Sequence, residues 1–175
     1  MKNTPMPEWN YLKSILDYNP HTGVFTWKVS FRNNIKIGQI AGCLWIDKRN
    51  PDSKYYQIVI TGKQYKLHRL AYFYITNIDP TEKDIDHING NSLDNRFENL
   101  RLATNADNNK NKKKHKNNKS GYKGVSWHKR IKKWQAEIQV NNKQIPLGYY
   151  TNKFYAALVY ARAAKKYFGE FRRKG

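Results

Sequence analysis

The segment from Asp86 to Asn109 holds the residue types that could carry out a reaction. Asp86 and His87 are adjacent, and asparagines follow them at positions 95, 99, 105, 108 and 109. Hydrolysis of a phosphodiester needs a group that activates water and a hard cation that stabilises charge on the phosphate and the leaving oxygen. Carboxylate and carboxamide oxygens ligate such cations, and histidine titrates near neutral pH. The segment therefore suits metal-assisted hydrolysis of a phosphodiester.

Four local elements must hold these side chains in place. The pattern predicts a strand over residues 84–88, a turn at Asn89-Gly90-Asn91 and a returning strand over residues 99–102. A helix over residues 103–111 follows, with Thr104 or Asn105 as its cap. Neighbouring residues of a regular strand point to opposite faces. Asp86 and His87 can therefore share a site only if the strand bends or ends there.

The same segment resembles the HNH endonucleases of phage and intron origin. The resemblance covers residues 66–112 and rests on the ordered runs Asp86-His87-Ile88-Asn89-Gly90-Asn91 and Asp94-Asn95-Arg96-Phe97-Glu98-Asn99-Leu100-Arg101, followed by the asparagines of residues 105–109. It implies a ββα-metal fold that cuts DNA with one divalent ion, Mg²⁺ or Mn²⁺.

The resemblance also implies a role for each motif residue. Asp86 corresponds to a metal ligand and His87 to the general base. Asn99 corresponds to the asparagine that fixes the loop and orients the histidine, and Asn108 to the second metal ligand. Two rivals for that last position stay open, Asn105 and Asn109.

Other polar residues near the motif have simpler interpretations. An isolated Asp-His pair beside Asn-Gly is more typical of a structural turn than of a site, and only the whole ordered series favours a nuclease. Asp84 is expected to be a solvated acid and Asn95 a loop former. The run His68-Arg69-Leu70-Ala71 also fits the family pattern; His68 is expected to be packed at a helix start, and its role stays open.

The charge of the chain is concentrated in its C-terminal part. The 175 residues include 33 Lys and Arg against 13 Asp and Glu, for a formal charge of +20. Residues 1–100 hold 13 basic and 10 acidic residues, whereas residues 101–175 hold 20 and 3. Such a field attracts polyanions, and basic residues interleaved with aromatic ones favour nucleic acid over a membrane surface.

Composition excludes several other classes. No stretch approaches the roughly 20 apolar residues of a spanning helix, and the N-terminus lacks the apolar core of a secretory signal. The single cysteine, Cys43, excludes an internal disulfide and a cysteine-rich zinc site. We therefore expect a protein of a reducing compartment, the cytoplasm. The resemblance to phage and intron endonucleases implies that the cell is a bacterial host that carries a phage or mobile element.

The C-terminal section has the pattern of a sheet followed by a helix. Strands are predicted over residues 124–127, 134–140 and 144–149. In the middle strand Trp134, Ala136, Ile138 and Val140 share one face, which predicts a core side and a polar side. Thr151 is expected to cap a helix over residues 152–168 whose packed stripe is Phe154, Ala157, Leu158, Ala161, Ala164 and Lys165.

This section resembles the plant ethylene-response (Apetala-type) DNA-binding domain. The resemblance rests on the alanine-rich helix and on the runs Ser120-Gly121-Tyr122-Lys123-Gly124-Val125-Ser126-Trp127, Trp134-Gln135-Ala136-Glu137-Ile138 and Leu147-Gly148-Tyr149-Tyr150. The resemblance implies that the sheet lies in the major groove of duplex DNA. The matching outward positions are Lys123, Ser126, His128, Arg130, Glu137, Gln139 and Gln144. The plant domain places arginines and a tryptophan there, so its site preference does not carry over.

A basic arm joins the two sections, because residues 110–121 are almost wholly polar. We expect its lysines to follow phosphates without reading sequence: Lys112, Lys113, Lys114, Lys116 and Lys119.

The N-terminal stretch is expected to be mixed, with a helix over residues 10–16, strands over 23–27 and 55–60, a turn over 61–64, a return over 65–67 and a core helix over 68–75.

The sequence thus predicts an α+β protein in four parts. These are an N-terminal mixed segment (1–65), an HNH ββα-metal core (66–112), a basic linker (113–120) and an Apetala-like DNA-binding domain (121–175). The predicted function is a metal-dependent endonuclease of homing type that acts on double-stranded DNA, as a monomer or a homodimer. The alternative is a non-catalytic DNA-binding regulator that keeps the HNH scaffold; an RNA-binding protein is less favoured.

Overall fold

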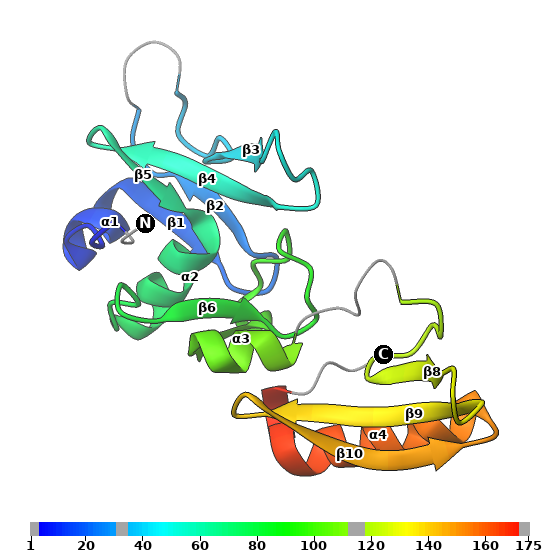
Figure 1. Cartoon of the computed structure of the whole chain (residues 1–175). Helices are drawn as coiled ribbons and strands as arrows, with labels where there is room; N and C mark the ends of the chain where they lie inside the picture. Colours follow the sequence, from blue (N-terminus) through cyan, green and yellow to red (C-terminus); the bar gives the residue numbers. More distant parts are fainter. Residues whose placement is uncertain (1–3, 31–34, 112–117, 172–175) are drawn as a thin grey trace. The chain divides into compact units, whose positions relative to one another are not determined.

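The structure is a computed structural model that describes residues 4–30, 35–111 and 118–171. The chain divides into two compact units, Met1–Asn105 and Ala106–Gly175. Each unit combines helices with small antiparallel sheets (Figure 1), which confirms the predicted α+β class. In the described residues no helix is both long enough and apolar enough to cross a membrane.

The first unit begins with a short helix that leads directly into a hairpin. Helix α1 spans Trp9–Ile15 and is capped by Glu8, whose carboxylate accepts from the amides of Asn10 and Tyr11. Strand β1 (Leu16–Asn19) pairs antiparallel with β2 (Val24–Trp27). The predicted helix is therefore present, but the strand that follows it was not predicted.

A three-stranded antiparallel sheet carries the next part of the chain. Its strands are β3 (Cys43–Ile46), β4 (Lys54–Ile60) and β5 (Lys63–Lys66), in the order β3-β4-β5. Helix α2 (Leu67–Thr76) starts where β5 ends, and Asn77 closes it in the left-handed conformation. The hairpin and the core helix match the prediction, whereas β3 was missed.

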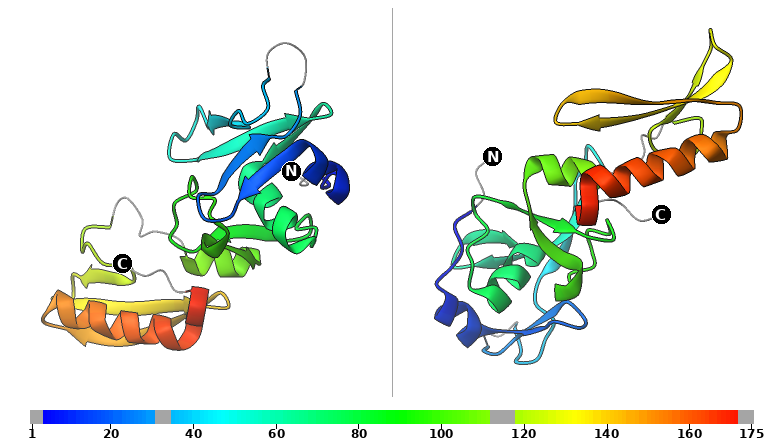
Figure 2. Two further views of the ribbon diagram at one scale, coloured as in Figure 1. Left: turned by 180° about the vertical axis from the view of Figure 1, so that it is seen from behind. Right: turned by 90° about the horizontal axis from the view of Figure 1, so that it is seen from below.

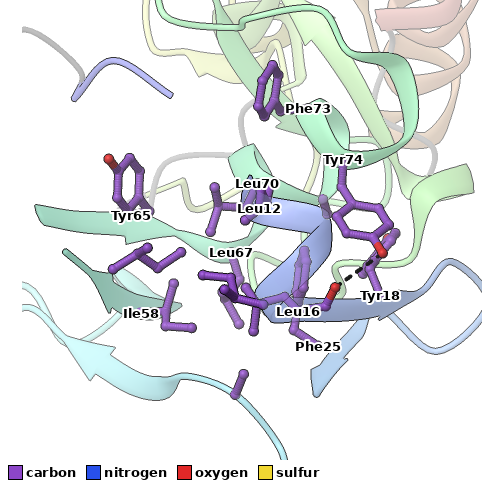
Figure 3. Packing of buried hydrophobic residues seen from close by; sticks show 14 of the residues in the cluster. Leu12, Leu16, Tyr18, Phe25, Ile58, Tyr65, Leu67, Leu70, Phe73 and Tyr74 are labelled. Carbon is purple, nitrogen blue, oxygen red and sulfur yellow. Dashed lines mark hydrogen bonds between the residues drawn. The ribbon is translucent and has the colours of Figure 1, made fainter. Parts of the chain in front are cut away.

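The core of the first unit lies between this sheet, the β1–β2 hairpin and helices α1 and α2. Leu12, Leu16, Phe25 and Leu70 have no exposed surface. Figure 3 shows these side chains converging, with the Tyr74 hydroxyl donating to the Leu16 carbonyl at 3.3 Å. Burial of this kind contributes roughly 1.5–3 kcal/mol for each large side chain. Helix α2 is therefore held firmly in the core of the first unit.

The predicted motif segment forms a second small hairpin in the first unit. Strand β6 (Asp84–His87) pairs antiparallel with β7 (Leu100–Ala103), and a short 3₁₀ helix η2 (Phe97–Asn99) precedes β7. Helix α3 (Asn105–Asn111) begins after Thr104. The order strand, loop, strand, helix is the one that the sequence predicted.

The second unit is a three-stranded sheet with a helix packed on one face (Figure 2). Strands β8 (Val125–His128), β9 (Lys133–Val140) and β10 (Lys143–Tyr150) lie in the order β10-β9-β8. Helix α4 (Lys153–Phe168) follows, and a short 3₁₀ helix η3 (Gly169–Phe171) closes the unit. Ala136 and Ile138 of the middle strand face the helix and are buried.

Two details of helix α4 differ from the prediction. Its cap is Asn152, whose side chain accepts from the amide of Phe154, and not Thr151. Its buried residues are Ala156, Ala164 and Phe168, whereas Phe154 and Leu158 of the predicted stripe are 59% and 47% exposed. Of these buried residues only Ala164 belongs to the predicted stripe.

Candidate active site

His87 ends strand β6 and points to the core side of the hairpin. It shares that face with Ile85, and its side chain is 8% exposed. The strand stops here because the carbonyl of His87 accepts from the amide of Gly90, which closes the Asn-Gly turn. The following amide, that of Ile88, donates to the carbonyl of Asn99. The strand thus ends at His87, but Asp86 and His87 still lie on opposite faces of β6.

Two side chains hold the His87 ring. Its Nε2 lies 3.3 Å from Oδ1 of Asn95. The ring of His68, near the start of helix α2, meets it edge to face with the centroids 5.0 Å apart. Burial lowers the pKa of His87 below its ordinary value, although Asn95, Asp86 and Asp94 oppose that effect. The imidazole is therefore neutral at pH 7 and able to accept a proton.

Asn95 is more than the loop former that the sequence suggested. It is 3% exposed, and its backbone carbonyl accepts from the Tyr18 hydroxyl at 2.7 Å. Gly23 approaches the same backbone so closely that a Cβ there would lie 2.5 Å from the Asn95 carbonyl carbon. The β1–β2 hairpin thus fixes the side chain that meets His87. The amide oxygen of Asn95 is an acceptor, so it suits the His87 tautomer that carries its proton on Nε2.

Asn99 fixes the loop that carries Asn95. Its Oδ1 accepts from the amide of Asn89 at 2.9 Å, and its Nδ2 donates to the carbonyl of Asp94 at 2.8 Å. It is 5% exposed, so both bonds are shielded from water. The resemblance implies that Asn99 fixes the loop and orients the histidine; the structure shows the loop bonds of Asn99 and, in addition, a side-chain contact between Asn95 and His87.

A second set of bonds braces the same loop from outside. Asp94 accepts from the Arg96 guanidinium at 2.8 Å and from Nδ2 of Asn89 at 2.7 Å. These bonds, led by the one from Arg96, lower the pKa of Asp94 to about 2. The carboxylate therefore stays ionised at neutral pH and keeps the loop closed.

Asp86 lies on the other face of β6, directly opposite Arg101 in β7. Its Oδ2 accepts from Nη2 of Arg101 at 2.7 Å and from Nε at 3.0 Å. The two side chains are only 11% and 12% exposed, so water screens the pair weakly. A cation bound by Asp86 must therefore share the carboxylate with Arg101 or displace it.

The remaining predicted ligand belongs to the second unit. Asn108 lies on helix α3, and its Oδ1 is buried. The side chains of its two rivals, Asn105 and Asn109, are outside the part of the chain that the structure describes. Among the described residues no three His, Cys, Asp or Glu side chains gather as a metal site. The expected ligands are one carboxylate and one carboxamide, which suit a hard cation that keeps several waters.

Three residues of the site were missed or left without a role by the sequence. They are Asn95, His68 and Arg101. The sequence did contain a signal for Arg101. In the predicted hairpin this basic residue lies opposite Asp86, and residues of opposite charge at such cross-strand positions are expected to pair. Nothing local signals the contact between His68 and His87, which depends on how α2 packs on the hairpin.

The outer face of the second sheet carries several of the residues predicted to contact DNA. The strand register places Gln139 opposite Gln144, and Ser126 opposite Gln135. Because residues two apart in β9 share a face, these side chains lie on the side opposite the helix. The described members of this outer face that were predicted are Ser126, His128, Glu137, Gln139 and Gln144.

The other predicted contacts lie elsewhere. Lys123 precedes β8 and its Nζ donates to the carbonyl of Lys110 at 2.8 Å, while Arg130 is exposed in the turn between β8 and β9. Lys119 is exposed next to the arm. Four lysines of the arm lie outside the described residues: Lys112, Lys113, Lys114 and Lys116.

Comparison with known proteins locates the family signal in the first motif. Residues 65–110 match the protein-family model described as HNH endonuclease. A stretch of 60 residues is 45% identical to "Protein 3.8" of Escherichia phage T7, and it covers 34% of this chain and 50% of that protein. The chain thus spans about half the length of this curated relative. No solved structure matches the chain. Residues 65–110 therefore form a domain of the HNH endonuclease type.

Proposed function

We propose that this protein is a metal-dependent DNA endonuclease in which His87 is the general base. The observation that carries the proposal is the buried, neutral His87 at the end of β6, held by Asn95 within the segment that matches the HNH endonuclease model. A neutral imidazole is the group that a hydrolytic reaction needs to activate water.

The described side chains support the following steps. Nδ1 of His87 accepts a proton from water while the water oxygen attacks the phosphorus. The bond from phosphorus to the 3′ oxygen then breaks, and that oxygen takes up a proton, so the products are a 5′-phosphate and a 3′-hydroxyl. Asn95 keeps the ring oriented, and Asn99 keeps the loop that bears Asn95 in place.

Asp86 and Asn108 are the residues that would hold one divalent ion, Mg²⁺ or Mn²⁺. Both offer an oxygen, the donor that such hard cations prefer. When bound, the ion stabilises negative charge on the phosphate and the leaving oxygen. In this proposal Arg101 neutralises the charge of Asp86 when the ion is not bound.

We propose that the second unit positions the protein on duplex DNA. Residues 101–175 contain 20 Lys and Arg against 3 Asp and Glu, and the polar outer face of the β8–β10 sheet is free of the helix. Residues 66–112 would then be the nuclease, 113–120 a basic linker and 121–175 the DNA-binding part, as in the Apetala-type domain that the sequence resembles. The lysines supply affinity that is sensitive to salt, and the sheet sets the position of the protein along the DNA.

The setting that we propose is a bacterial cell that carries a phage or mobile element, where the protein acts in the cytoplasm as an endonuclease of homing type. The similarity to a protein of Escherichia phage T7 supports the phage origin. One set of site residues per chain cuts one strand, so a monomer would nick DNA and a homodimer would break both strands.

One observation favours a second candidate, a DNA-binding regulator that retains the HNH scaffold without cutting. Asp86, which the nuclease needs as a ligand, is already paired with Arg101. In a regulator that pair would be purely structural. Such a protein would bind duplex DNA with the same affinity in the presence of Mg²⁺ or of a chelator and would leave it intact.

Supercoiled plasmid separates the two candidates. Full-length protein is incubated with plasmid in Mg²⁺, in Mn²⁺ and in EDTA, and relaxed and linear products are measured. The nuclease proposal expects products only with a divalent ion and none from His87→Ala. Intact plasmid in every metal, together with a clear shift of the same DNA on a gel, would establish the regulator.

A further inference from the structure

One face of the β3–β4–β5 sheet carries two aromatic rings and a lysine in a row. Trp45 of β3 is opposite Tyr55 of β4, and Gln57 of β4 is opposite Lys66 of β5. Tyr55 and Gln57 are two residues apart in one strand, so all four side chains project from the same face. The other face holds Ile58 and Ile60, which belong to the core. The row is therefore on the side of the sheet that the core does not use.

The three side chains of this row contact one another closely. The rings of Trp45 and Tyr55 are stacked, with centroids 4.7 Å apart and planes at 28°. The ammonium of Lys66 lies 4.5 Å from the centroid of Tyr55. A cation over an aromatic ring is held by the negative face of that ring. The aromatic pair thus gives the Lys66 ammonium a defined position.

The row continues to the proposed general base. The ring of Tyr55 meets that of His68 edge to face at 6.4 Å, and His68 meets His87 in the same manner at 5.0 Å. Lys66 precedes His68 by two residues, at the junction of β5 and α2. Every member of this chain of contacts belongs to the first unit. The ammonium of Lys66 and the proposed base are therefore linked by one series of ring contacts within the first unit.

Lys66 has no acidic partner that would explain its position. Among the described residues no carboxylate lies within ion-pair distance of its Nζ. Burial and the charge of Arg69 lower the pKa of Lys66, and the opposing effect of Asp84 is smaller than either. Lys66 is exposed, and a cation that lies beside another cation is stabilised when an anion compensates the two charges. The site therefore has the charge of an anion site.

We infer that Lys66 binds a phosphate of the DNA strand that is being cut, next to the phosphate attacked at His87, and that Trp45 and Tyr55 support it. This inference rests on the proposed nuclease function and extends it to a part of the chain with no assigned role. Lysine contacts a phosphate oxygen as a point charge, and aromatic rings pack against deoxyribose and bases. The β3–β4–β5 sheet thereby aligns the strand with the base.

A binding measurement tests the inference without relying on cleavage. The affinity of full-length His87→Ala for a labelled duplex is measured by fluorescence anisotropy over a range of salt, alone and combined with Lys66→Gln. Loss of one phosphate contact should weaken binding roughly tenfold at low salt and reduce the slope of log K against log salt by about 0.9.

The chain offers a matched control in the same strand. Lys63 is also an exposed lysine of β5, but it is opposite Ile60 and therefore lies on the other face of the sheet. Lys63→Gln removes the same charge and should leave the slope and the affinity near those of the parent. Equal losses in the two variants would overturn the inference, because they would show an effect of net charge alone.

Two further variants separate a lost contact from a damaged fold. Lys66→Arg keeps a cation and should restore most of the affinity, whereas Tyr55→Leu removes the ring beneath the ammonium and should weaken binding several-fold with an unchanged melting temperature. Wild-type affinity in Lys66→Gln would refute the inference even if the plasmid assay shows cleavage. An uncut plasmid combined with the expected loss in Lys66→Gln would refute the nuclease and not the phosphate contact.

Discussion

The ring of His68 lies edge to face on the ring of His87, with their centroids 5.0 Å apart and their planes at 72°. His68 comes from α2, which packs in the core of the first unit, and His87 ends the short hairpin β6–β7. A two-stranded hairpin is marginally stable by itself. The contact therefore anchors the proposed base to the most rigid part of the unit.

Loss of the His68 ring should loosen the site. We expect His68→Ala to lower the free energy of unfolding by about 1–3 kcal/mol, because it leaves a cavity behind His87. His68→Phe fills most of that space and should recover most of the stability. Thermal unfolding of both variants beside the wild type measures this. If both variants melt at the wild-type temperature, the ring contact does not anchor the hairpin.

Asn95→Ala should slow cleavage without weakening DNA binding. His87 loses the partner that orients its ring, and such supporting contacts are typically worth 10- to 100-fold in activity. Single-turnover nicking measures the rate, and anisotropy measures the affinity. Asn91→Ala is a suitable control, because Asn91 is exposed in the same loop and its side chain bonds only backbone in the described residues. Equal rates for the two variants would contradict the assignment of Asn95.

Arg101→Gln should change the response to metal. Without the guanidinium the Asp86 carboxylate is no longer neutralised in the ion-free protein, so divalent ions meet less competition. We expect Mg²⁺ to raise the melting temperature of Arg101→Gln by more than that of the wild type. Asp86→Asn in the same background should remove the difference. An identical Mg²⁺ response in wild type and Arg101→Gln would mean that Asp86 does not bind the ion.

The Asp94 network predicts a stability that depends on acid pH. The pKa of Asp94 is about 2 in the folded protein, against 3.8 for an unperturbed aspartate, so ionised Asp94 stabilises the fold above pH 4. That contribution is lost as pH falls from about 4 toward 2. Because Arg96 is partly exposed, water screens its pair with Asp94, and we expect this contribution of Asp94 to be about 1 kcal/mol.

Asp94→Asn provides the measurement. Its free energy of unfolding should be lower than that of the wild type at pH 7, and the gap should shrink at pH 3. Glu82→Gln removes an exposed acid outside this network and should show no such gap. A difference between Asp94→Asn and wild type that stays constant from pH 7 to pH 3 would exclude an effect of the Asp94 charge.

Much of the local structure could be predicted from the sequence. Periodic apolar residues identified α2 and β9, and the Asn89-Gly90 pair identified the turn that ends β6. These elements follow from short-range rules. Strands β1 and β3 were missed because they are four residues long and their pairing with β2 and β4 is set by tertiary contacts.

The site was less accessible to sequence reasoning, for a physical reason. The position of His87 at the strand end follows from a local turn, and the sequence anticipated the need for it. The contacts of His87 with Asn95 and His68 depend instead on the packing of separate elements. Similarly, the buried face of α4 was misjudged because tertiary packing sets how a helix is turned on a sheet: Ala156, Ala164 and Phe168 are buried, whereas Leu158 is 47% exposed.

The central claim is that His87 cuts DNA with the help of a divalent ion, and supercoiled plasmid nicking tests it most directly. Wild-type protein and His87→Ala are compared in Mg²⁺ and in EDTA, at protein concentrations where gel shifts show that both bind the plasmid. The account predicts nicked plasmid for the wild type in Mg²⁺ alone and none for His87→Ala in either buffer. Equal nicking by His87→Ala would contradict it.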